Sequence, residues 1–507
     1  MDLPLADEEN GQLTSDIEQN EMILKRIFQN CSDMVYRKIQ HSGQIQWLIV
    51  YIESLVDEKH LDEYVLKPLI SNNLSHDGFV PANIEIIDDR LVSVGLLDKS
   101  SKVADIVRNM LGGQVAIMSA GDALALTVAV SDRAQRNPEE PPSELVVRGP
   151  RDGFIENITT NIGLLRSRLK TSRLKTESLT IGQFSQTRVV ISYLNGIVTD
   201  SLVDEVRKRL SRIQVDGVLE SGYIEGFIED YPYSPFPQVN SSERPDVIAA
   251  GLLEGKVAIL VDTTPFVLLV PMTFWSALHA SEDYYNRSLI ATFVRWIRFL
   301  FIFISIFAPS LYVAVTTYHQ EMIPTNLMLS IAAAREAVPF PALIEALLME
   351  VMFEALREAG VRMPRQVGQA VSIVGALVIG QAAVEAGIIS APVVIIVATT
   401  GIASFTIPRF NFSYGIQFLR FPMILLAGTL GLYGIVLGFL GILLHVTSLR
   451  SFGVPYFSPI APLSFQGLKD VLISQPIWNR NLRPESTGSN NPVRIPKGQK
   501  PGPGQGK

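Results

Sequence analysis

The 507-residue sequence is poor in the groups on which most enzymes and metal sites depend. It contains one cysteine, Cys31, which excludes a disulfide framework and a cysteine-rich zinc site. It has no GxSxG, HExxH or EF-hand motif. Between Lys256 and Lys469 there is no lysine, so every fixed positive charge in that region is arginine. We therefore predict no enzyme activity, no metal and no cofactor.

Charge and hydropathy divide the chain into two parts. Residues 1–295 contain 28 Lys and Arg against 41 Asp and Glu, whereas residues 296–507 contain 15 against 9. The mean hydropathy of +0.25 is high for a soluble protein of this length. The first ten residues are acidic and lack the order of a secretory signal, so we expect the first part to be cytosolic. The second part has the composition of a membrane domain.

The pattern of the first part predicts two α/β subdomains, over 16–137 and 143–285, after a disordered tail over 1–15. A proline-rich stretch at 138–142 separates the subdomains. Apolar runs and helical spacing predict strands at 47–52, 114–119, 123–130, 189–194, 215–219, 257–261 and 266–270. They predict helices at 57–70, 152–169, 200–210 and 245–253, and one or two surface helices over about 16–40. The order strand, helix, strand over 189–219 predicts a parallel crossover.

The second part predicts an all-α polytopic membrane domain over 296–450. Uncharged runs long enough to cross a bilayer predict spans at 299–318, 367–384, 386–408 and 421–446. A membrane-proximal segment over 451–480 and a disordered basic tail over 481–507 follow. Four crossings leave the tail on the cytosolic side. A fifth crossing within 324–360 would place it on the opposite side, and the sequence leaves both possibilities open.

Residues 324–360 are both apolar and charged, and they carry the candidate pore or gating residues. Pro339 and Pro341 break the segment into two helical pieces, and broken helices at membrane depth usually line a cavity. The candidates are these two prolines and four of the carboxylates of the segment: Glu336, Glu345, Glu350 and Glu354. Because carboxylates are costly at bilayer depth, we expect them to face water, a cation or an arginine. Three interpretations remain open: an interfacial amphipathic helix, a pore lining, and ion pairs between helices.

Two glycine patterns need separate interpretations. Gly434 and Gly438 form a GxxxG pattern in the last predicted span, for which close helix packing is the favoured role. Residues 251–256 (GLLEGK) resemble a phosphate-binding loop, but the spacing is too short and Val257 replaces the hydroxyl residue that such a loop needs. We therefore expect no nucleotide at residues 251–256.

Longer strings of residues resemble one known family. They are 220–231 (ESGYIEGFIEDY), 234–263 (SPFPQVNSSERPDVIAAGLLEGKVAILVDT), 318–326 (YHQEMIPTN), 339–352 (PFPALIEALLMEVM), 367–388 (VGQAVSIVGALVIGQAAVEAGI) and 449–457 (LRSFGVPYF). Over about residues 16–462 the chain resembles the A subunit of GerA-type spore germination receptors. It departs from the usual pattern at Ala337, where a glycine is common.

The resemblance implies a receptor subunit in the inner membrane of the spore, with a cytosolic amino-terminal domain. It implies two partners, a transporter-like B subunit that binds the germinant and a lipoprotein C subunit, besides membrane lipid. It also implies that the subunit forms homo-oligomers that conduct monovalent cations when nutrients are sensed. Nucleic acid is not among the expected partners. The alternatives are a secondary transporter and a non-conducting scaffold that relays a signal to a cytosolic effector.

Overall fold

The chain folds into two compact units, described here from a computed structural model. The model describes residues 9–41, 44–71, 97–130, 140–141, 143–363, 380–488 and 490–502. Unit 1 is made of Met1–Glu229, Val239–Pro271 and Ile477–Lys507. Unit 2 is made of Asp230–Gln238 and Met272–Pro476. The chain therefore passes from one unit to the other four times.

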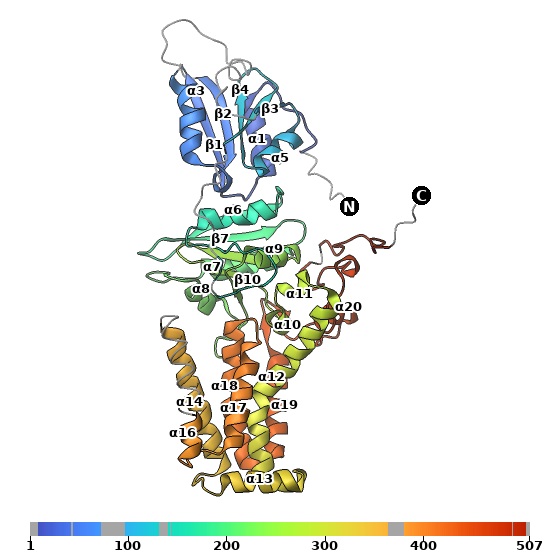
Figure 1. Cartoon of the computed structure of the whole chain (residues 1–507). Coiled ribbons are helices and arrows are strands. Elements are labelled where there is room, and N and C mark those ends of the chain that lie inside the picture. Colours follow the sequence, from blue (N-terminus) through green and yellow to red (C-terminus); the bar gives the residue numbers. More distant parts are fainter. Residues whose placement is uncertain are drawn as a thin grey trace. The chain divides into compact units, whose positions relative to one another are not determined.

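The first subdomain of unit 1 is a five-stranded antiparallel sheet with helices on both faces (Figure 1). The strands lie in the order β1-β2-β4-β5-β3: β1 Met34–His41, β2 Gln44–Ile52, β4 Gln114–Ser119, β5 Ala125–Ala129 and β3 Leu97–Ser100. Alternate residues of β2 face opposite layers, as the period of a strand requires. Leu48 packs with helices α1 (Ile17–Ile27) and α5 (Val103–Leu111), whereas Ile49 packs with the helical segment α2-η2-α3 (Glu58–His60, Leu61–Leu66 and Lys67–Ser71).

The second subdomain has the same strand order in a second antiparallel sheet. Its order is β6-β7-β9-β10-β8: β6 Leu174–Ile181, β7 Thr187–Leu194, β9 Val257–Val261, β10 Val267–Val270 and β8 Asn240–Ser242. Helices α6 (Ile158–Arg168) and α9 (Pro245–Leu253) pack on one face. Helices α7 (Asp200–Ser211) and α8 (Ser221–Ile228) lie between β7 and β8 in the chain, where the first subdomain has α2-η2-α3.

Matching local contacts indicate that the two subdomains are an internal duplication. Buried Asn20 in α1 exchanges two hydrogen bonds with the backbone of Thr14, six residues earlier, and buried Asn161 in α6 does the same with Ile155. Val-Ala-Ile occurs in both β4 and β9, in each case two residues after a glycine with positive φ, Gly113 or Gly255. Residues 251–256, which resemble a phosphate loop, therefore form the connection from α9 to β9 and correspond to the connection from α5 to β4.

Two predictions for the second subdomain are wrong. Residues 215–219 form no strand, because their backbone contacts the turn between β6 and β7 instead: Gln183 donates to the carbonyl of Val215 and Phe184 to that of Asp216. The predicted parallel crossover is absent as well, since β7 pairs with β6 and β9 and both pairs are antiparallel. The predicted helix at 152–169 begins only at Ile158, where Asn157 caps it.

A buried ion pair joins the two subdomains within unit 1. Asp33, next to β1, accepts two hydrogen bonds from the guanidinium of Arg166 in α6, and both side chains are buried. The hydroxyl of Thr176 donates to the same carboxylate at 2.8 Å. Burial alone would raise the pKa of Asp33, but these donors outweigh it and hold the pKa below its usual range. The pair therefore stays charged at neutral pH.

Both ends of the chain are more ordered than the sequence predicts. Gly11 accepts a hydrogen bond from Val103, and Leu13 is buried, although disorder was expected over 1–15; residues 1–8 lie outside the described chain. Disorder was also expected over 481–507. Instead, Arg483 donates to the carbonyl of Leu253 at 2.8 Å, and Thr487 to that of Glu254 at 2.6 Å. These side chains satisfy backbone carbonyls at the end of α9, which charge composition alone does not reveal.

Unit 2 is a helical bundle (Figure 1). Its helices are α10 Phe274–Leu278, α11 Glu282–Tyr285, α12 Ser288–Thr317, α13 Thr325–Arg335, α14 Ala342–Arg362, α16 Gly380–Glu385, α17 Ala391–Phe405, α18 Phe410–Leu430, α19 Leu432–Ser448 and α20 Phe465–Val471, and a two-stranded ribbon is made of β11 Arg450–Ser451 and β12 Val454–Pro455. Within the described residues, α12 is the one helix both long and apolar enough to span a membrane, while α17 and α19 are apolar but shorter.

The four predicted spans agree with the helices of unit 2 to different extents. Residues 299–317 of the first predicted span fall in α12, and 386–408 contain the shorter α17. Of 367–384, only 380–384 belong to the described chain. A single span over 421–446 is wrong, because Gly431 adopts φ +62° and separates α18 from α19. The uncharged run contains a turn that hydropathy does not register.

The predicted packing glycines lie in α19, where it folds back against α18. A Cβ atom on Gly434 would lie 2.1 Å from the backbone oxygen of Leu426, and one on Gly438 would lie 2.3 Å from the sulfur of Met423. A Cβ atom on Gly441, in the same helix, would have nothing within 4 Å. Backbone cannot yield as a methionine side chain can, so Gly434 is the most constrained of the three.

We predict that Gly434→Ala destabilises the protein and that Gly441→Ala does not. Overpacking against backbone costs about 1–3 kcal/mol, whereas alanine in an open helical position gains up to about 1 kcal/mol over glycine. The midpoint of thermal unfolding of the detergent-purified protein measures both effects. Equal midpoints for the two variants would contradict the close packing of α19 on α18.

Candidate functional site in the helical unit

An aromatic cluster defines one end of the bundle. The ring of Phe236 contacts Phe274 of α10, Phe412 at the start of α18 and His445 at the end of α19. His445 Nε2 lies 2.9 Å from the hydroxyl of Ser234. This near end therefore contains the beginning of α18, the end of α19 and residues 230–238, where the chain first enters unit 2.

The opposite, far end of the bundle is fixed by contacts at the end of α12. The hydroxyl of Tyr318 donates to the carbonyls of Gly428 and Thr429 at 3.1 and 3.0 Å. Leu343, at the start of α14, packs against Gly428 as well. Helices α12 and α18 thus run from the near end to the far end. Helix α14 starts at the far end and returns, since the guanidinium of Arg357 lies over the ring of Tyr414 near the start of α18, 4.8 Å from its centre.

A buried arginine lies at the centre of the bundle. Arg420 of α18 is 1% exposed, and its Nη1 donates to Glu350 Oε2 of α14 at 2.5 Å. Its Nε and Nη2 donate to the backbone oxygen and the hydroxyl of Ser305 in α12, at 2.8 and 3.0 Å. The hydroxyl of Thr400 in α17 lies 3.4 Å from Glu350 Oε1. One guanidinium–carboxylate pair thereby connects four helices.

A proline explains why a backbone carbonyl of α12 is available to this arginine. Pro309 lies inside α12, four residues after Ser305, and has no N–H to donate to the Ser305 carbonyl. Arg420 supplies the missing hydrogen bond. A carbonyl released in this way must find a partner wherever water is excluded. Ser305, Pro309 and Arg420 therefore act as one unit.

The other predicted pore residues lie in different environments. Glu345 is fully buried; it accepts a hydrogen bond from the backbone N–H of Ser390, and its Oε2 lies 3.6 Å from Arg335 Nε. Glu354 is partly exposed and pairs with Arg357 at 2.6 Å. Glu336, Pro339 and Pro341 are exposed in and beside the break between α13 and α14. The candidates therefore do not form one cluster.

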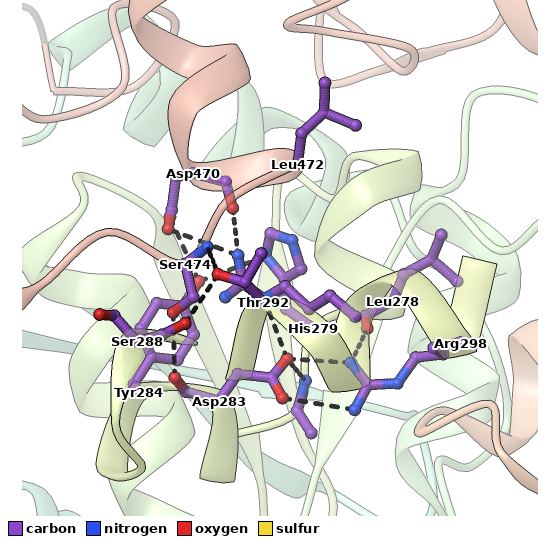
Figure 2. Close-up of polar contacts among 12 residues, drawn as sticks. Leu278, His279, Asp283, Tyr284, Ser288, Thr292, Arg298, Asp470, Leu472 and Ser474 are labelled. Atoms are coloured by element: carbon purple, nitrogen blue, oxygen red, sulfur yellow. Dashed lines mark hydrogen bonds and ion pairs between the residues drawn. The ribbon is translucent and has the colours of Figure 1, made fainter. Parts of the chain in front are cut away.

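A second buried charge cluster lies where α12 begins. Figure 2 shows Asp283 of α11 facing Arg298, whose Nη1 lies 2.9 Å from its Oδ2 and also donates to the carbonyl of Leu278. Arg295 Nε lies 3.2 Å from the same oxygen and also donates to the carbonyl of Asp470. Ser474 donates its hydroxyl to the carbonyl of Asp283. The cluster joins the start of α12 to the segment that follows α20.

Comparison with known proteins decides the family. The model of the Bacillus/Clostridium GerA spore germination protein matches residues 22–486. The chain belongs to the GerA family. This GerA chain is 45% identical to the "Uncharacterized membrane protein YfkQ" of Bacillus subtilis (strain 168), over 98% of this chain and 96% of that protein. It is 45% identical to Spore germination protein KA of the same organism, over 93% of this chain and 87% of that protein.

Further relatives are also named for spore germination. Spore germination protein GerLA of Bacillus cereus is 38% identical, over 92% of this chain and 95% of that protein. A crystal structure of the N-terminal domain of the A subunit of the Bacillus megaterium spore germinant receptor GerK3 is 34% identical, with a TM-score of 0.42, and covers 52% of this chain and 98% of that one. Membership confirms the resemblance to the A subunits, and the names of the relatives support a role in spore germination for this GerA chain.

Sequence reasoning found the carboxylates of α14 but missed their partner. Arg420 lies seventy residues after Glu350, and helical spacing relates only residues within one helix. The available signal was an arginine inside an apolar run, with Pro309 inside another. Of the three interpretations of the broken segment, ion pairing between helices describes Glu350. An interfacial or pore-facing role is left for the more exposed Glu336 and Glu354.

We predict that Glu350 and Arg420 are strongly coupled. Removing one partner of a buried ion pair leaves the other unpaired and costs about 3–5 kcal/mol, whereas replacing both by apolar residues is often neutral. Glu350→Leu and Arg420→Met should each destabilise the detergent-purified protein, and the double variant should lose less stability than the two single variants together, although its Ser305 carbonyl stays without the donor that Arg420 supplies. The readout is the midpoint of unfolding in sodium dodecyl sulfate.

The pair Glu358–Arg362 is the matched control. It lies in the same helix α14, spaced four residues apart, with side chains 57% and 78% exposed. Exposed pairs contribute about 0.2–1 kcal/mol, so the same cycle should give little coupling there. Additive losses at Glu350 and Arg420 would contradict the central ion pair.

Proposed function

We propose that this GerA chain is a polytopic membrane subunit of a germinant receptor, and that it oligomerises into a channel that conducts monovalent cations when it is opened. The proposal includes the partners that the family resemblance implies, a germinant-binding B subunit and a lipoprotein C subunit. It also includes the inner membrane of the spore, with unit 1 in the cytosol. The observation that carries it is the arrangement of charge on α14 within the bundle.

The direction of the helices supports six membrane crossings. Helices α12 and α18 run from the near end to the far end, and α14, α17 and α19 run back. Arg362 ends α14 at the near end, whereas Gly387, just after α16, lies at the far end beside Ala337. The span that the sequence predicts over 367–384 lies between these two points, mostly outside the described residues; counted together with the five described helices, it makes six crossings. Six crossings return the chain to the side from which it started.

The four candidate carboxylates of the broken segment divide into two groups that support different roles. Glu345 and Glu350 are buried and held by donors of the same chain, so they serve the packing of one subunit. Glu354 keeps part of its surface exposed, and Glu336 is exposed at the end of α13. A carboxylate repeated around the axis of an oligomer forms a ring of negative charge that admits cations and rejects anions. Glu336 and Glu354 are therefore the candidates for such a ring.

We predict that liposomes containing the purified protein, with its partner subunits and germinant, release K⁺ in preference to Cl⁻. Glu336→Gln or Glu354→Gln should lower the ratio of K⁺ to Cl⁻ permeability, because each removes negative charge from the proposed ring. Glu205→Gln in α7 is the control, since Glu205 also pairs with an arginine of its own helix but lies in unit 1.

The outcomes separate the proposal from its rivals. Liposomes that remain silent with all subunits and germinant present would favour a scaffold. Saturable uptake of one solute would favour a transporter. Unchanged selectivity in both variants would remove these carboxylates from the conduction path.

A further inference from the structure

A row of exposed apolar side chains begins in the first turns of α12. This helix has 30 residues and is therefore about 45 Å long, whereas the hydrocarbon core of a bilayer is about 30 Å thick. The members of the row each keep more than half of their surface exposed: Leu289, Phe293, Trp296, Leu300 and Phe303. They are three or four residues apart, which places them on one face of the helix. One apolar stripe therefore runs from the start of α12 into the span predicted at 299–318.

A second apolar segment, in and after α20, lies beside the first turns of α12. The indole Nε1 of Trp296 donates to the carbonyl of Leu472 at 2.8 Å. The backbone N–H of Ser474 donates to the hydroxyl of Thr292 at 3.0 Å (Figure 2). The exposed apolar side chains of this segment are Phe465, Leu472 and Ile473. Phe465 and Leu472 are two helical turns apart, so they lie on the same face of α20.

The buried charge cluster at the start of α12 holds these two segments together. Arg295 donates to the carbonyl of Asp470 in α20, and its Nε lies 3.2 Å from Asp283 Oδ2. Arg295 is completely buried, whereas Phe293 and Trp296 on either side of it in α12 are exposed. The protein therefore covers Arg295 and Asp283 and leaves the apolar side chains at its surface. We name these exposed side chains the α12–α20 surface: Leu289, Phe293, Trp296, Phe465, Leu472 and Ile473.

The continuity of α12 indicates what lies against this surface. In the proposed topology, the last two members of the stripe, Leu300 and Phe303, fall within a membrane crossing. The first three members continue the same face of the helix before that crossing. They therefore lie at the depth of the lipid headgroups, where tryptophan is enriched.

Two exposed cations border the α12–α20 surface. Arg287 precedes α12, and Lys469 belongs to α20. Among the described residues, no carboxylate forms an ion pair with either side chain. Basic residues beside an apolar face that contains tryptophan, phenylalanine and leucine are typical of protein surfaces that bind anionic lipid.

We propose that the α12–α20 surface binds the surface of an anionic bilayer. Its apolar side chains lie at the boundary between headgroups and acyl chains, and Arg287 and Lys469 lie beside lipid phosphates. The lipid thereby holds the segment that follows α20 against the start of α12. This inference rests on the membrane location in the proposed function, but it needs neither ion conduction nor a partner subunit.

Quenching of a fluorophore by labelled lipids tests the surface in liposomes that contain the full chain. Bimane is attached to single cysteines in a Cys31→Ser background. At Phe293→Cys and Ile473→Cys, a nitroxide near the lipid headgroup should cause a greater loss of fluorescence than a nitroxide at the end of an acyl chain. At Phe303→Cys the order should be reversed, because this position lies deeper. Val147→Cys, at an exposed apolar position of unit 1, should lose fluorescence with neither lipid.

The preference for anionic lipid is tested with one nitroxide carried on phosphatidylglycerol or on phosphatidylcholine at equal mole fraction. Phosphatidylglycerol should quench Ile473→Cys more strongly. Adding Arg287→Gln and Lys469→Gln together should remove this difference but keep the quenching by phosphatidylcholine. Adding Lys208→Gln, at an exposed lysine of α7 in unit 1, should leave the difference unchanged.

The outcomes separate this inference from the proposed function. The lipid surface is wrong if Phe293→Cys and Ile473→Cys stay unquenched while Phe303→Cys is quenched, since the protein then lies in the bilayer without this contact. Cross-linking of Ile473→Cys between two chains, without quenching, would instead assign the surface to contacts between copies. Equal quenching by the two lipids would contradict the role of Arg287 and Lys469. An unquenched Phe303→Cys would contradict the membrane crossing of α12 itself.

Discussion

The helical unit depends on one constraint: a charge buried among apolar helices must be neutralised by another group of the same bundle. Arg420 meets this constraint with Glu350 and with the carbonyl that Pro309 leaves without a donor in α12. Arg420 needs the Glu350 carboxylate as its counter-charge, and the Ser305 carbonyl needs Arg420 as its donor. A conformational change that moves α14 away from α18 must either carry the pair along or expose both charges, so the pair restricts the motions of the bundle that could open the proposed channel.

The internal duplication of unit 1 was visible in the sequence only in fragments. Val115-Ala-Ile and Val257-Ala-Ile occupy equivalent strands, and Asn20 and Asn161 make equivalent contacts. Periodicity located most strands of both subdomains, because buried strands are continuous apolar runs. It misplaced 215–219, since the same apolar character serves a loop that packs on a turn. It took β1 as part of a helix and missed β3, β6 and β8, which contain polar residues.

Two errors in the spans predicted from the sequence offset each other in the number of crossings. Hydropathy took 421–446 as one span, although Gly431 turns the chain within it, and it left α14 undecided because of its carboxylates. In the proposed topology, residues 421–446 form two spans and α14 forms another, so that four predicted spans become six and the number of crossings stays even. The tail beyond Ile477 packs on α9 of unit 1. Because the tail and unit 1 then lie on the same side of the membrane, the number of crossings must be even. Contacts between helices decide where α18 ends and how α14 lies. Neither hydropathy nor charge counts describe such contacts.

Labelling of introduced cysteines from each side of the membrane tests this account most directly. In a Cys31→Ser background, Lys497→Cys reports the tail and Glu336→Cys reports the break between α13 and α14; both positions are exposed. With sealed vesicles and an impermeant maleimide, six crossings predict that Lys497→Cys reacts only from the side of unit 1 and Glu336→Cys only from the opposite side. Reaction of both from the same side would contradict the proposed arrangement of the bundle.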